Sequence, residues 1–364
     1  MTKPLLTVCV ITYNHVKYIE EAIDSILAQE VDFSWKLVIA DDFSTDGTKE
    51  ILERYKAKYP ELIDLILQKS NVGPESNWLD LMSYPTSKYV LYAEGDDYLT
   101  DPKKLQKQVD FLEHHKDYSI CFHPVKVIYE DSSYPDEIFP TSEFRHNKDV
   151  LELKDLLQNN FIQTNSAMYR WRFTDEKIKT AFPKSISPGD WYLHIIHAEL
   201  GEIGFIDSVM SAYRRHNAGL WWDAGNNKGL FWEKQAIPHA RLYEHLLDSF
   251  GDNAELRNPI ELHIDEAIEG VALVSSPGRE RILQEIFDKF PTFIPGYITR
   301  ASKRLSKLEN DINYILKVKS DEKAMYDKTV ALLEADNKRF KKSLTHKVEQ
   351  KVRRDLKRIR KVQK

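Results

Sequence analysis

The sequence has few cysteines and no long apolar run. Only Cys9 and Cys121 occur among its 364 residues, and Cys9 lies within an apolar run. We therefore expect two buried thiols in a reducing cytosol, with no need for a disulfide between them. No stretch of about 18 uncharged apolar residues exists, which excludes a transmembrane helix. The N-terminal residues lead directly into an apolar segment without a signal-peptide pattern, so we expect no export.

The sequence also lacks an internal repeat and a glycine-rich phosphate loop. Its length fits one large domain with additions, or two domains. The net charge of −5 is unevenly distributed. Residues 339–364 contain twelve Lys or Arg and two acids, which gives this segment +10 and leaves −15 for the rest of the chain. The C-terminal tail therefore differs electrostatically from everything before it.

The spacing of apolar residues over the first 130 positions alternates between strand and helix patterns. Apolar runs of strand length occupy residues 5–11, 37–40, 62–67 and 89–93. Helix-spaced apolar residues begin at Ile19 and at Ile51, the second after the capping residues 44–48, and Asp101-Pro102 starts a further helix. This alternation predicts an α/β fold with a mostly parallel, Rossmann-like sheet that helices cover on both faces.

Polar clusters follow three of these predicted strands. Residues 12–14 follow the first strand, Asp41 and Asp42 follow the second, and residues 94–97 follow the fourth. Parallel α/β sheets bind ligands at the carboxyl ends of their strands. The clusters therefore predict one ligand site at this edge of the sheet.

The last of these clusters places three acids, Glu94, Asp96 and Asp97, within four positions. Carboxylates this close repel one another, and a divalent cation relieves the repulsion. Oxygen ligands suit magnesium or manganese, which would bridge a diphosphate. Gly95 would let a ligand approach closely. The alternative is a solvated acidic turn, with Asp101 capping the helix that follows.

Two other acidic motifs each have a functional and a structural interpretation. Asp41 and Asp42 form either a helix-capping turn or a site where a carboxylate accepts a hydrogen bond from a nucleobase imide or a ribose hydroxyl. Asp190 stands at the start of an apparent helix. It is either an N-cap or a general base that takes a proton from an acceptor hydroxyl, and the helix N-terminus would keep it ionised.

A basic motif, Tyr213-Arg214-Arg215-His216, ends a strand-like segment at residues 206–213. An arginine here could neutralise a leaving diphosphate, and a neutral histidine could complete a metal shell. The alternative is a basic loop without a function.

Together these segments resemble glycosyltransferase family 2, whose members have the GT-A fold. The matching segments are Val-Ile-Thr-Tyr-Asn at 10–14, Ile-Ala-Asp-Asp-Phe-Ser-Thr-Asp-Gly-Thr at 39–48, Glu-Gly-Asp-Asp-Tyr at 94–98 before Asp101-Pro102, Gly-Asp-Trp at 189–191, and residues 213–216. Their order at successive strand ends is far more specific than any single motif. The resemblance covers about residues 5–222, and Ile11 stands where many members have proline.

The resemblance implies roles in donor binding for the first motifs. Thr12 and Tyr13 would bind the donor nucleotide, with Tyr13 lining the base pocket. Asp42 would bind the uracil or its equivalent, with Asp41 nearby. Arg214 would contact the donor.

The resemblance implies roles in metal binding and catalysis for the remaining motifs. Asp96 and Asp97 would be the metal-binding acids of a DxD-type motif, with Asp96 also at the donor, and His216 would contact the metal or the diphosphate. Asp190 would be the catalytic base. Glu94 stands where the family often has aspartate, which leaves its part in metal binding open.

The reaction implied by this resemblance is an inverting, metal-dependent transfer of a sugar from a nucleotide-sugar donor, with a UDP-sugar favoured and Mn²⁺ or Mg²⁺ as the cofactor. One in-line displacement at the anomeric carbon inverts its configuration. The acceptor would be a glycan or a lipid-linked glycan in cell-surface polysaccharide synthesis. Residues 119–171 should face it, with Thr164 and Asn165 among the polar candidates.

The predicted organisation is a GT-A domain at 1–225, a helical extension at 226–300 and a charged helical segment at 301–364. Within the first domain, residues 1–117 would bind the nucleotide sugar and residues 118–225 would supply the acceptor and catalytic half. The C-terminal helices are a candidate for oligomer formation.

The basic tail at 339–364 has apolar residues at every third or fourth position, which predicts an amphipathic cationic helix. Such a helix could lie on an anionic membrane surface and make a cytoplasmic enzyme peripheral on the inner face of the cell membrane. The alternatives are a solvated or protein-binding helix and nucleic-acid binding. The enzyme assignment leads us to expect no nucleic acid.

Two other classes of function remain open at this point. One is a nucleotidyltransferase-like enzyme acting on a nucleotide diphosphate, although the chain lacks the N-terminal loop rich in glycine and lysine that such an enzyme would need. The other is a non-catalytic assembly scaffold, which would have no need of all these acids.

Overall fold

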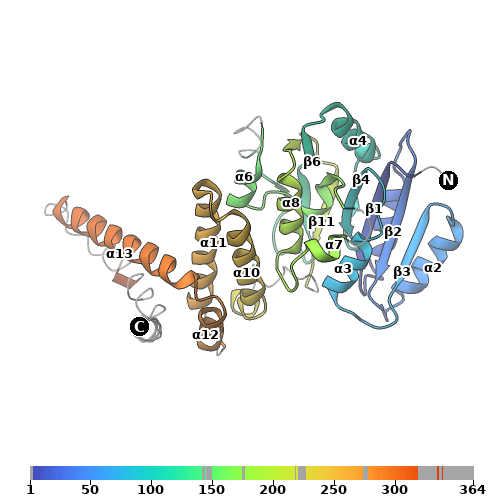
Figure 1. Cartoon of the computed structure of the whole chain (residues 1–364). Helices are drawn as coiled ribbons and strands as arrows, with labels where there is room; N and C mark the ends of the chain where they lie inside the picture. The colour runs from blue at the N-terminus through green and yellow to red at the C-terminus, as the bar shows by residue number, and fades with distance from the viewer. Residues whose placement is uncertain are drawn as a thin grey trace. The chain divides into compact units, whose positions relative to one another are not determined.

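A seven-stranded sheet forms the centre of the N-terminal part of the protein in the computed structural model (Figure 1). Its order is β10-β6-β9-β4-β1-β2-β3. The strands are β1 (Leu6–Thr12), β2 (Trp35–Asp41), β3 (Ile63–Leu67), β4 (Tyr89–Glu94), β6 (Tyr118–Phe122), β9 (Met168–Arg170) and β10 (Glu202–Phe205). All pairings are parallel except those of β9, which runs antiparallel to both β4 and β6. The predicted mostly parallel sheet is confirmed.

Helices pack on both faces of this sheet. Alternate residues of β1, such as Val8 and Val10, enter a buried cluster with α1 (Ile19–Leu27), α2 (Thr48–Lys58) and α4 (Lys104–His114). On the other face, Trp78 of α3 (Pro74–Met82) meets the ring of Tyr92 in β4 edge-on. Parallel neighbours require crossover connections, and helices of this kind supply them. The strands between them are therefore apolar on both sides, which explains why their sequences show unbroken apolar runs.

A second, four-stranded sheet has the order β5-β11-β7-β8. Its strands are β5 (Tyr98–Leu99), β11 (Ser211–Arg215), β7 (Val125–Tyr129) and β8 (Glu137–Phe139). Only four positions separate the end of β4 from the start of β5, so the acidic turn joins the two sheets. Because β11 pairs with β5, the basic motif lies beside this turn although more than a hundred residues separate them in sequence.

Several shorter elements lie in the second half of this part of the chain. They are α6 (Leu153–Gln158), the 3-10 helix η1 (Thr164–Ser166), α7 (Lys177–Ala181) and α8 (Gly189–Ala198). Cys9 and Cys121 are both buried and both free, as expected.

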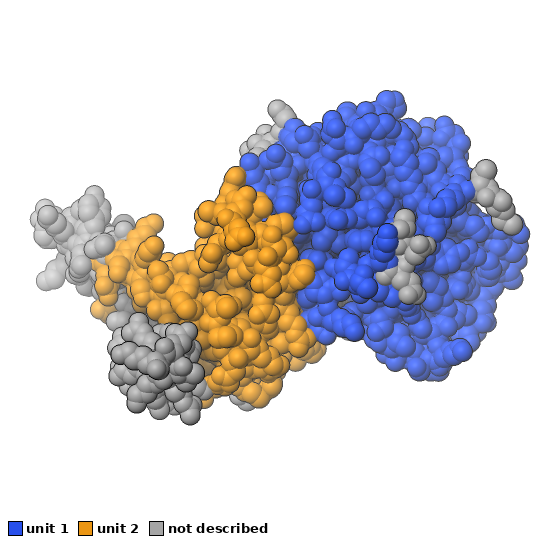
Figure 2. Space-filling view, viewed as in Figure 1, with its two compact units in different colours: residues 1–222 blue, residues 223–364 orange. Residues whose placement is uncertain are grey.

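The chain divides into two compact units, residues 1–222 and 223–364, which Figure 2 colours separately. The structure describes residues 3–141, 144, 150–173, 177–217, 219, 227–273, 278–318, 334, 335 and 338. Most of the predicted helical segment beyond 318 and all of the predicted basic tail at 339–364 lie outside these residues. The assignment of nucleotide-sugar binding to residues 1–117 and of the acceptor and catalytic half to residues 118–225 remains a prediction.

The second unit contains helices α10 (Lys228–Phe250), α11 (Ala254–Leu273), α12 (Arg279–Lys289) and α13 (Phe293–Val318). A predominantly helical C-terminal region was predicted, and the structure confirms it. None of the helices in the described ranges combines the length and apolar character needed to cross a membrane.

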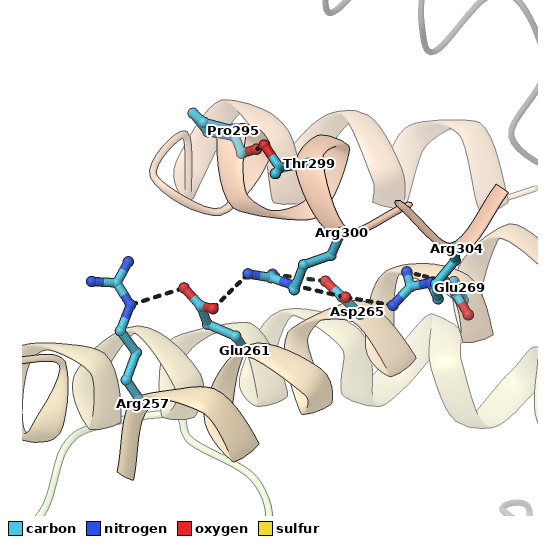
Figure 3. Close-up of polar contacts among 8 residues, drawn as sticks. All are labelled: Arg257, Glu261, Asp265, Glu269, Pro295, Thr299, Arg300 and Arg304. Carbon is cyan, nitrogen blue, oxygen red and sulfur yellow. Dashed lines mark hydrogen bonds and ion pairs between the residues drawn. The ribbon is translucent and has the colours of Figure 1, made fainter. Parts of the chain in front are cut away.

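A chain of ion pairs joins α11 to α13 (Figure 3). At its centre is Asp265, which is almost completely buried. Arg300 donates to both oxygens of this carboxylate at 2.9 and 2.8 Å, and Arg304 donates to Oδ2 at 2.7 Å. Two further acids of α11 extend the chain, because Glu261 pairs with Arg300 and Glu269 with Arg304. A buried carboxylate needs such donors to offset its lost hydration.

Lys104 in α4 is fully buried. Its Nζ donates to Gln108 Oε1 at 2.6 Å, and Gln108 in turn donates to the carbonyl oxygen of Ser166 at 2.8 Å. Burial lowers the pKa of Lys104 from 10.5 to about 7. A neutral lysine is the form that this environment accommodates.

We therefore predict that Lys104 makes stability depend on pH. The folded state disfavours the charged lysine, so its free-energy cost is full below pH 7 and shrinks as pH rises from 7 toward 10.5. Between pH 7 and 9 the free energy of unfolding of the wild type should rise relative to Lys104→Met by up to about 1.4 kcal/mol per pH unit.

Urea denaturation at pH 7, 8 and 9 measures this difference, with Lys103→Met as the matched control because Lys103 is exposed. Parallel pH profiles for the wild type and Lys104→Met would show that the lysine is charged in the folded protein.

Candidate functional site

Three neighbouring strands end together at one edge of the large sheet. In the parallel register, Thr12 of β1 lies opposite Asp41 of β2, and Ile11 lies opposite Glu94 of β4. The polar residues predicted at three strand ends are therefore adjacent in space. Thr12 and Asp41 are buried here, whereas Tyr13 leaves 45% of its surface exposed.

The two aspartates after β2 hold the loops around this edge. Asp41 accepts hydrogen bonds from the hydroxyl and the backbone N–H of Ser44. Asp42 Oδ1 accepts from the backbone N–H of Val72 at 2.7 Å. Both carboxylates are almost completely buried and shape the turn. The structure therefore shows their structural role, and their part in nucleotide binding remains a prediction.

Asp96 lies between two histidines. Its Oδ2 is 2.9 Å from Nε2 of His216 and 3.9 Å from Nε2 of His15. Burial acts to raise the pKa of Asp96, but the contact with His216 and the field of His15 outweigh it, so the net pKa is lowered. The carboxylate is therefore held in its ionised form. Its Oδ1 is buried and has no hydrogen-bond partner in the described part of the chain.

Asp97 belongs to a separate set of buried polar contacts, here called the polar node, with Asn165 and the backbone of Arg214. Its Oδ2 accepts from Asn165 Nδ2 at 2.8 Å, and its Oδ1 accepts from the backbone N–H of Arg214 at 2.9 Å. Asn165 also donates to the carbonyl oxygen of Ala212 and accepts from the Ser211 hydroxyl. Asp97 thus connects the acidic turn with η1 and β11, and both of its oxygens are engaged. Its predicted part in metal binding remains untested.

The side chain of Arg214 is held by the protein itself. Nε donates to the carbonyl oxygen of Asp96 at 3.0 Å, and Nη2 pairs with Glu21 at 2.6 Å. The guanidinium also lies over the rings of Tyr18 and Tyr98. In this arrangement Arg214 stabilises the acidic turn through the carbonyl oxygen of Asp96. The predicted contact of Arg214 with a donor remains a prediction.

Glu94 ends β4 and lies within electrostatic range of two other acids. Burial, with the charges of Asp96 and Asp190, raises the pKa of Glu94 to about 8. The start of α8 lies near the acidic turn, because Thr164 donates to Asp190 while its neighbour Asn165 donates to Asp97. Residues almost a hundred positions apart thus form one acidic site.

Asp190 occupies the first turn of α8, after Pro188 at the N-cap. Oδ2 accepts from the Thr164 hydroxyl at 3.0 Å, and Oδ1 accepts from the backbone N–H of Trp191 at 2.8 Å. Burial raises the pKa of Asp190, and these two hydrogen bonds act in the opposite direction. The helix N-terminus was expected to favour ionisation, but burial has the larger effect on the pKa. A raised pKa makes the carboxylate a stronger base than an exposed aspartate.

The structure also adds residues to the site that the sequence did not single out. His15 directly follows the 10–14 motif, but no periodicity or spacing marked it. Its Nδ1 is buried without a partner among the described residues, and a Cβ on Gly95 would lie only 3.0 Å from it. Gly95 is therefore needed for close packing, in addition to any ligand approach. The polar candidates Thr164 and Asn165, which could not be ranked from sequence, prove to contact Asp190 and Asp97.

The described residues contain no preformed cluster of three His, Cys, Asp or Glu side chains that could hold a metal ion. The residues around Asp96 nevertheless suit a divalent cation. A buried carboxylate oxygen without a partner faces no competing donor, and carboxylate and imidazole ligands are those that Mn²⁺ accepts. Asp96 and His216 are the closest such pair, and Glu94 and His15 are near them.

Known proteins resemble this chain in sequence and in fold. The sequence model of the family described as Glycosyl transferase family 2 matches residues 7–216. The uncharacterized protein Rv1520 of Mycobacterium tuberculosis (strain ATCC 25618 / H37Rv) is 42% identical over 243 residues, which are 67% of this chain and 68% of that protein.

Two solved structures share the fold. S. aureus TarS 1–349 in complex with UDP-GlcNAc has a TM-score of 0.57 at 21% identity, covering 81% of this chain and 82% of that one. The mannosyltransferase PcManGT from Pyrobaculum calidifontis, in complex with GDP-Man and Mn²⁺, has a TM-score of 0.50 at 16% identity, covering 84% and 88%. With the sheet topology, these likenesses support the predicted GT-A type of fold.

The node around Asp97 leads to a prediction about stability. Asparagine at this position would place an NH₂ group against one of two N–H donors, Asn165 Nδ2 or the Arg214 backbone. Asp97→Asn should lower the free energy of unfolding by about 1–3 kcal/mol, the cost of a buried donor without an acceptor.

The matched control is Asp96→Asn, which loses one contact with His216 and also removes repulsion within the turn. It should lower stability less than Asp97→Asn does. Equal denaturation midpoints for Asp97→Asn and the wild type would contradict the structural role of Asp97.

Proposed function

Because the chain belongs to glycosyl transferase family 2, we propose that it catalyses an inverting, metal-dependent transfer of a sugar from a nucleotide-sugar donor to a glycan acceptor. The observation that carries this proposal is the arrangement of three carboxylates. Glu94 and Asp96 lie at the end of β4. Two consecutive residues connect this turn with the start of α8, because Thr164 donates to Asp190 and Asn165 donates to Asp97. Donor diphosphate and acceptor hydroxyl would meet between these two elements.

A nucleoside diphosphate fits the edge of the sheet where β1, β2 and β4 end. Ligands of parallel α/β sheets bind at this position. The exposed ring of Tyr13 is available to cover a base, and Asp42 lies on the neighbouring strand end. A UDP-sugar is the favoured donor, and the complexes of TarS with UDP-GlcNAc and of PcManGT with GDP-Man support this class of ligand.

Asp96 and His216 are the proposed ligands of Mn²⁺ or Mg²⁺, with Asp97 as a further predicted one. When bound, such a cation neutralises charge on the leaving diphosphate. The contact between Asp96 and His216 brings a carboxylate oxygen within 2.9 Å of an imidazole nitrogen, and burial limits their contact with water. The Mn²⁺ in the PcManGT complex supports this choice of metal.

Asp190 is the proposed general base. Its two hydrogen bonds fix the orientation of the carboxylate, while burial raises its pKa above that of an exposed aspartate. The base would take the proton of the acceptor hydroxyl as the oxygen attacks the anomeric carbon from the side opposite the departing diphosphate. One such displacement inverts the configuration at that carbon.

The acceptor and the cellular location belong to the same proposal. We place the acceptor among glycans and lipid-linked glycans of the cell surface, and the enzyme in the cytoplasm, peripheral on the inner face of the membrane. The net charge of +10 over residues 339–364 is what supports contact with an anionic lipid surface. The C-terminal helices are the proposed place of any self-association.

The test of the enzyme assignment is a screen for hydrolysis and transfer with UDP-, GDP- and dTDP-sugars. We expect wild-type turnover with at least one donor in the presence of Mn²⁺. Asp190→Asn should reduce transfer by about 100-fold or more, because a general base contributes at least that factor. It should leave donor binding, measured by calorimetry, within about twofold.

Near wild-type transfer by Asp190→Asn would contradict the assignment of Asp190 as the general base. Absence of turnover with every donor, for a protein that folds normally, would instead favour the non-catalytic scaffold.

Thr164 provides a second test, because it acts on Asp190 without being the base. Its hydrogen bond favours the charged carboxylate, so the isosteric change Thr164→Val should raise the pKa of Asp190 further. The acidic limb of the rate profile should then move to higher pH, since transfer requires the ionised base. An unchanged limb with lower kcat at all pH values would show that Thr164 is only structural.

A further inference from the structure

A cavity of about 390 Å³ lies in the first unit, between the end of β8 and the end of α6. Its size falls in the range of small-molecule sites. Its lining includes the aromatic side chains of Phe139 and Phe161, three successive side-chain amides from Gln158, Asn159 and Asn160, and the carboxylate of Asp155.

The local sequence explains why three amides gather here. Glu152 and Asp155 form a capping box that starts α6, and the helix ends at Gln158. Asn159 then adopts an extended conformation (φ −154°, ψ 139°), which turns the chain out of the helix. Gln158 and Asn159 are exposed, whereas Phe161 is almost completely buried against Phe122 and Phe144. Phe139 is half-buried, so its ring, rather than that of Phe161, is the aromatic surface open to a ligand, and the amides form a polar rim.

The structure ties this cavity to the proposed base in two ways. The indole Nε1 of Trp191, the residue after Asp190, donates to the carbonyl oxygen of Leu156 in α6 at 2.9 Å. In addition, Thr164, which itself donates to Asp190, is the third residue after Phe161. Three steps along the chain span at most about 11 Å. The cavity is thus a fixed, short distance from the place where the acceptor hydroxyl would react.

The lining has the chemistry that recognises a pyranose ring. A sugar carries hydroxyls that both donate and accept hydrogen bonds, and a side-chain amide offers both functions in one plane. A sugar also has a face of C–H groups, which an aromatic ring can cover. None of the lining residues is a lysine or an arginine, so no cationic side chain holds a phosphate there. The carboxylate of Asp155 also lines the cavity, and its Oδ2 already accepts from the backbone N–H of Glu152 at 2.9 Å.

We propose that this cavity binds a sugar residue of the acceptor glycan, adjacent to the residue that receives the transferred sugar. The proposal deepens the proposed function and rests on it, because the bound sugar is part of an acceptor only if the protein transfers sugars. Binding of a sugar in the cavity does not itself require that activity. A second bound unit would orient the reactive hydroxyl and would make an oligosaccharide a better acceptor than a single sugar.

The test is saturation-transfer NMR of the full chain with methyl glycosides of glucose, galactose, mannose and N-acetylglucosamine. We expect at least one of them to bind the wild type. The double variant Gln158→Ala/Asn159→Ala should bind it at least about tenfold more weakly, and both positions are exposed, so the fold is retained. Gln284→Ala, which removes an amide from α12 in the other unit, is the matched control and should bind as the wild type does.

The proposal is overturned if no glycoside binds the wild type, or if the double variant and the control bind equally well. Donor hydrolysis, measured in the same proteins, distinguishes failure of the cavity proposal from failure of the proposed function. If a glycoside binds the cavity but no donor is hydrolysed, the proposed function fails while sugar binding stands. If the donor is hydrolysed but no glycoside binds, the cavity proposal alone fails.

Discussion

The rest of the site depends on the buried carboxylate of Asp97 and on the hydrogen bonds that it accepts. It lies where a parallel strand of the large sheet passes into the first strand of the small sheet, and it accepts one hydrogen bond from η1 and one from the backbone of β11. A buried acid requires donors of this kind, and here the donors come from segments about 70 and 120 residues further along the chain. Its need for partners therefore fixes where the second half of the unit meets the first.

The consequences reach the residues with a chemical role. Once β11 is held beside the acidic turn, His216 at its end faces Asp96, and Arg214 lies behind the turn against Glu21 and two tyrosine rings. Once η1 is held there, Thr164 meets Asp190. The two neighbouring aspartates therefore have different roles. Asp97 is bound by the protein on both oxygens, whereas Asp96 keeps a buried oxygen without a partner among the described residues.

The sequence was sufficient for β1, β2, β3 and β4 and for the edge at which the site lies. The strand predicted at 206–213 was misplaced, because β10 ends at Phe205 and β11 begins at Ser211. Unbroken apolar runs mark strands that are covered on both faces, and the acids at their ends become neighbours through the parallel register of β1, β2 and β4. His15 and Glu21 were not assigned roles, and Asn165 was named only as a candidate facing the acceptor, because each acts through contacts between segments distant in sequence. For the same reason Asp96 and Asp97, adjacent in sequence and alike in type, could not be told apart until β11 was in place.

The central claim is that Asp96, oriented by His216, forms the metal-dependent part of a nucleotide-sugar site. Calorimetry of UDP, GDP and dTDP binding, with and without Mn²⁺, tests this claim most directly. The account predicts that at least one nucleotide binds the wild type at least about tenfold more tightly when Mn²⁺ is present, and that Asp96→Asn loses this gain while retaining its fold. An equal gain in affinity for Asp96→Asn and the wild type would contradict it.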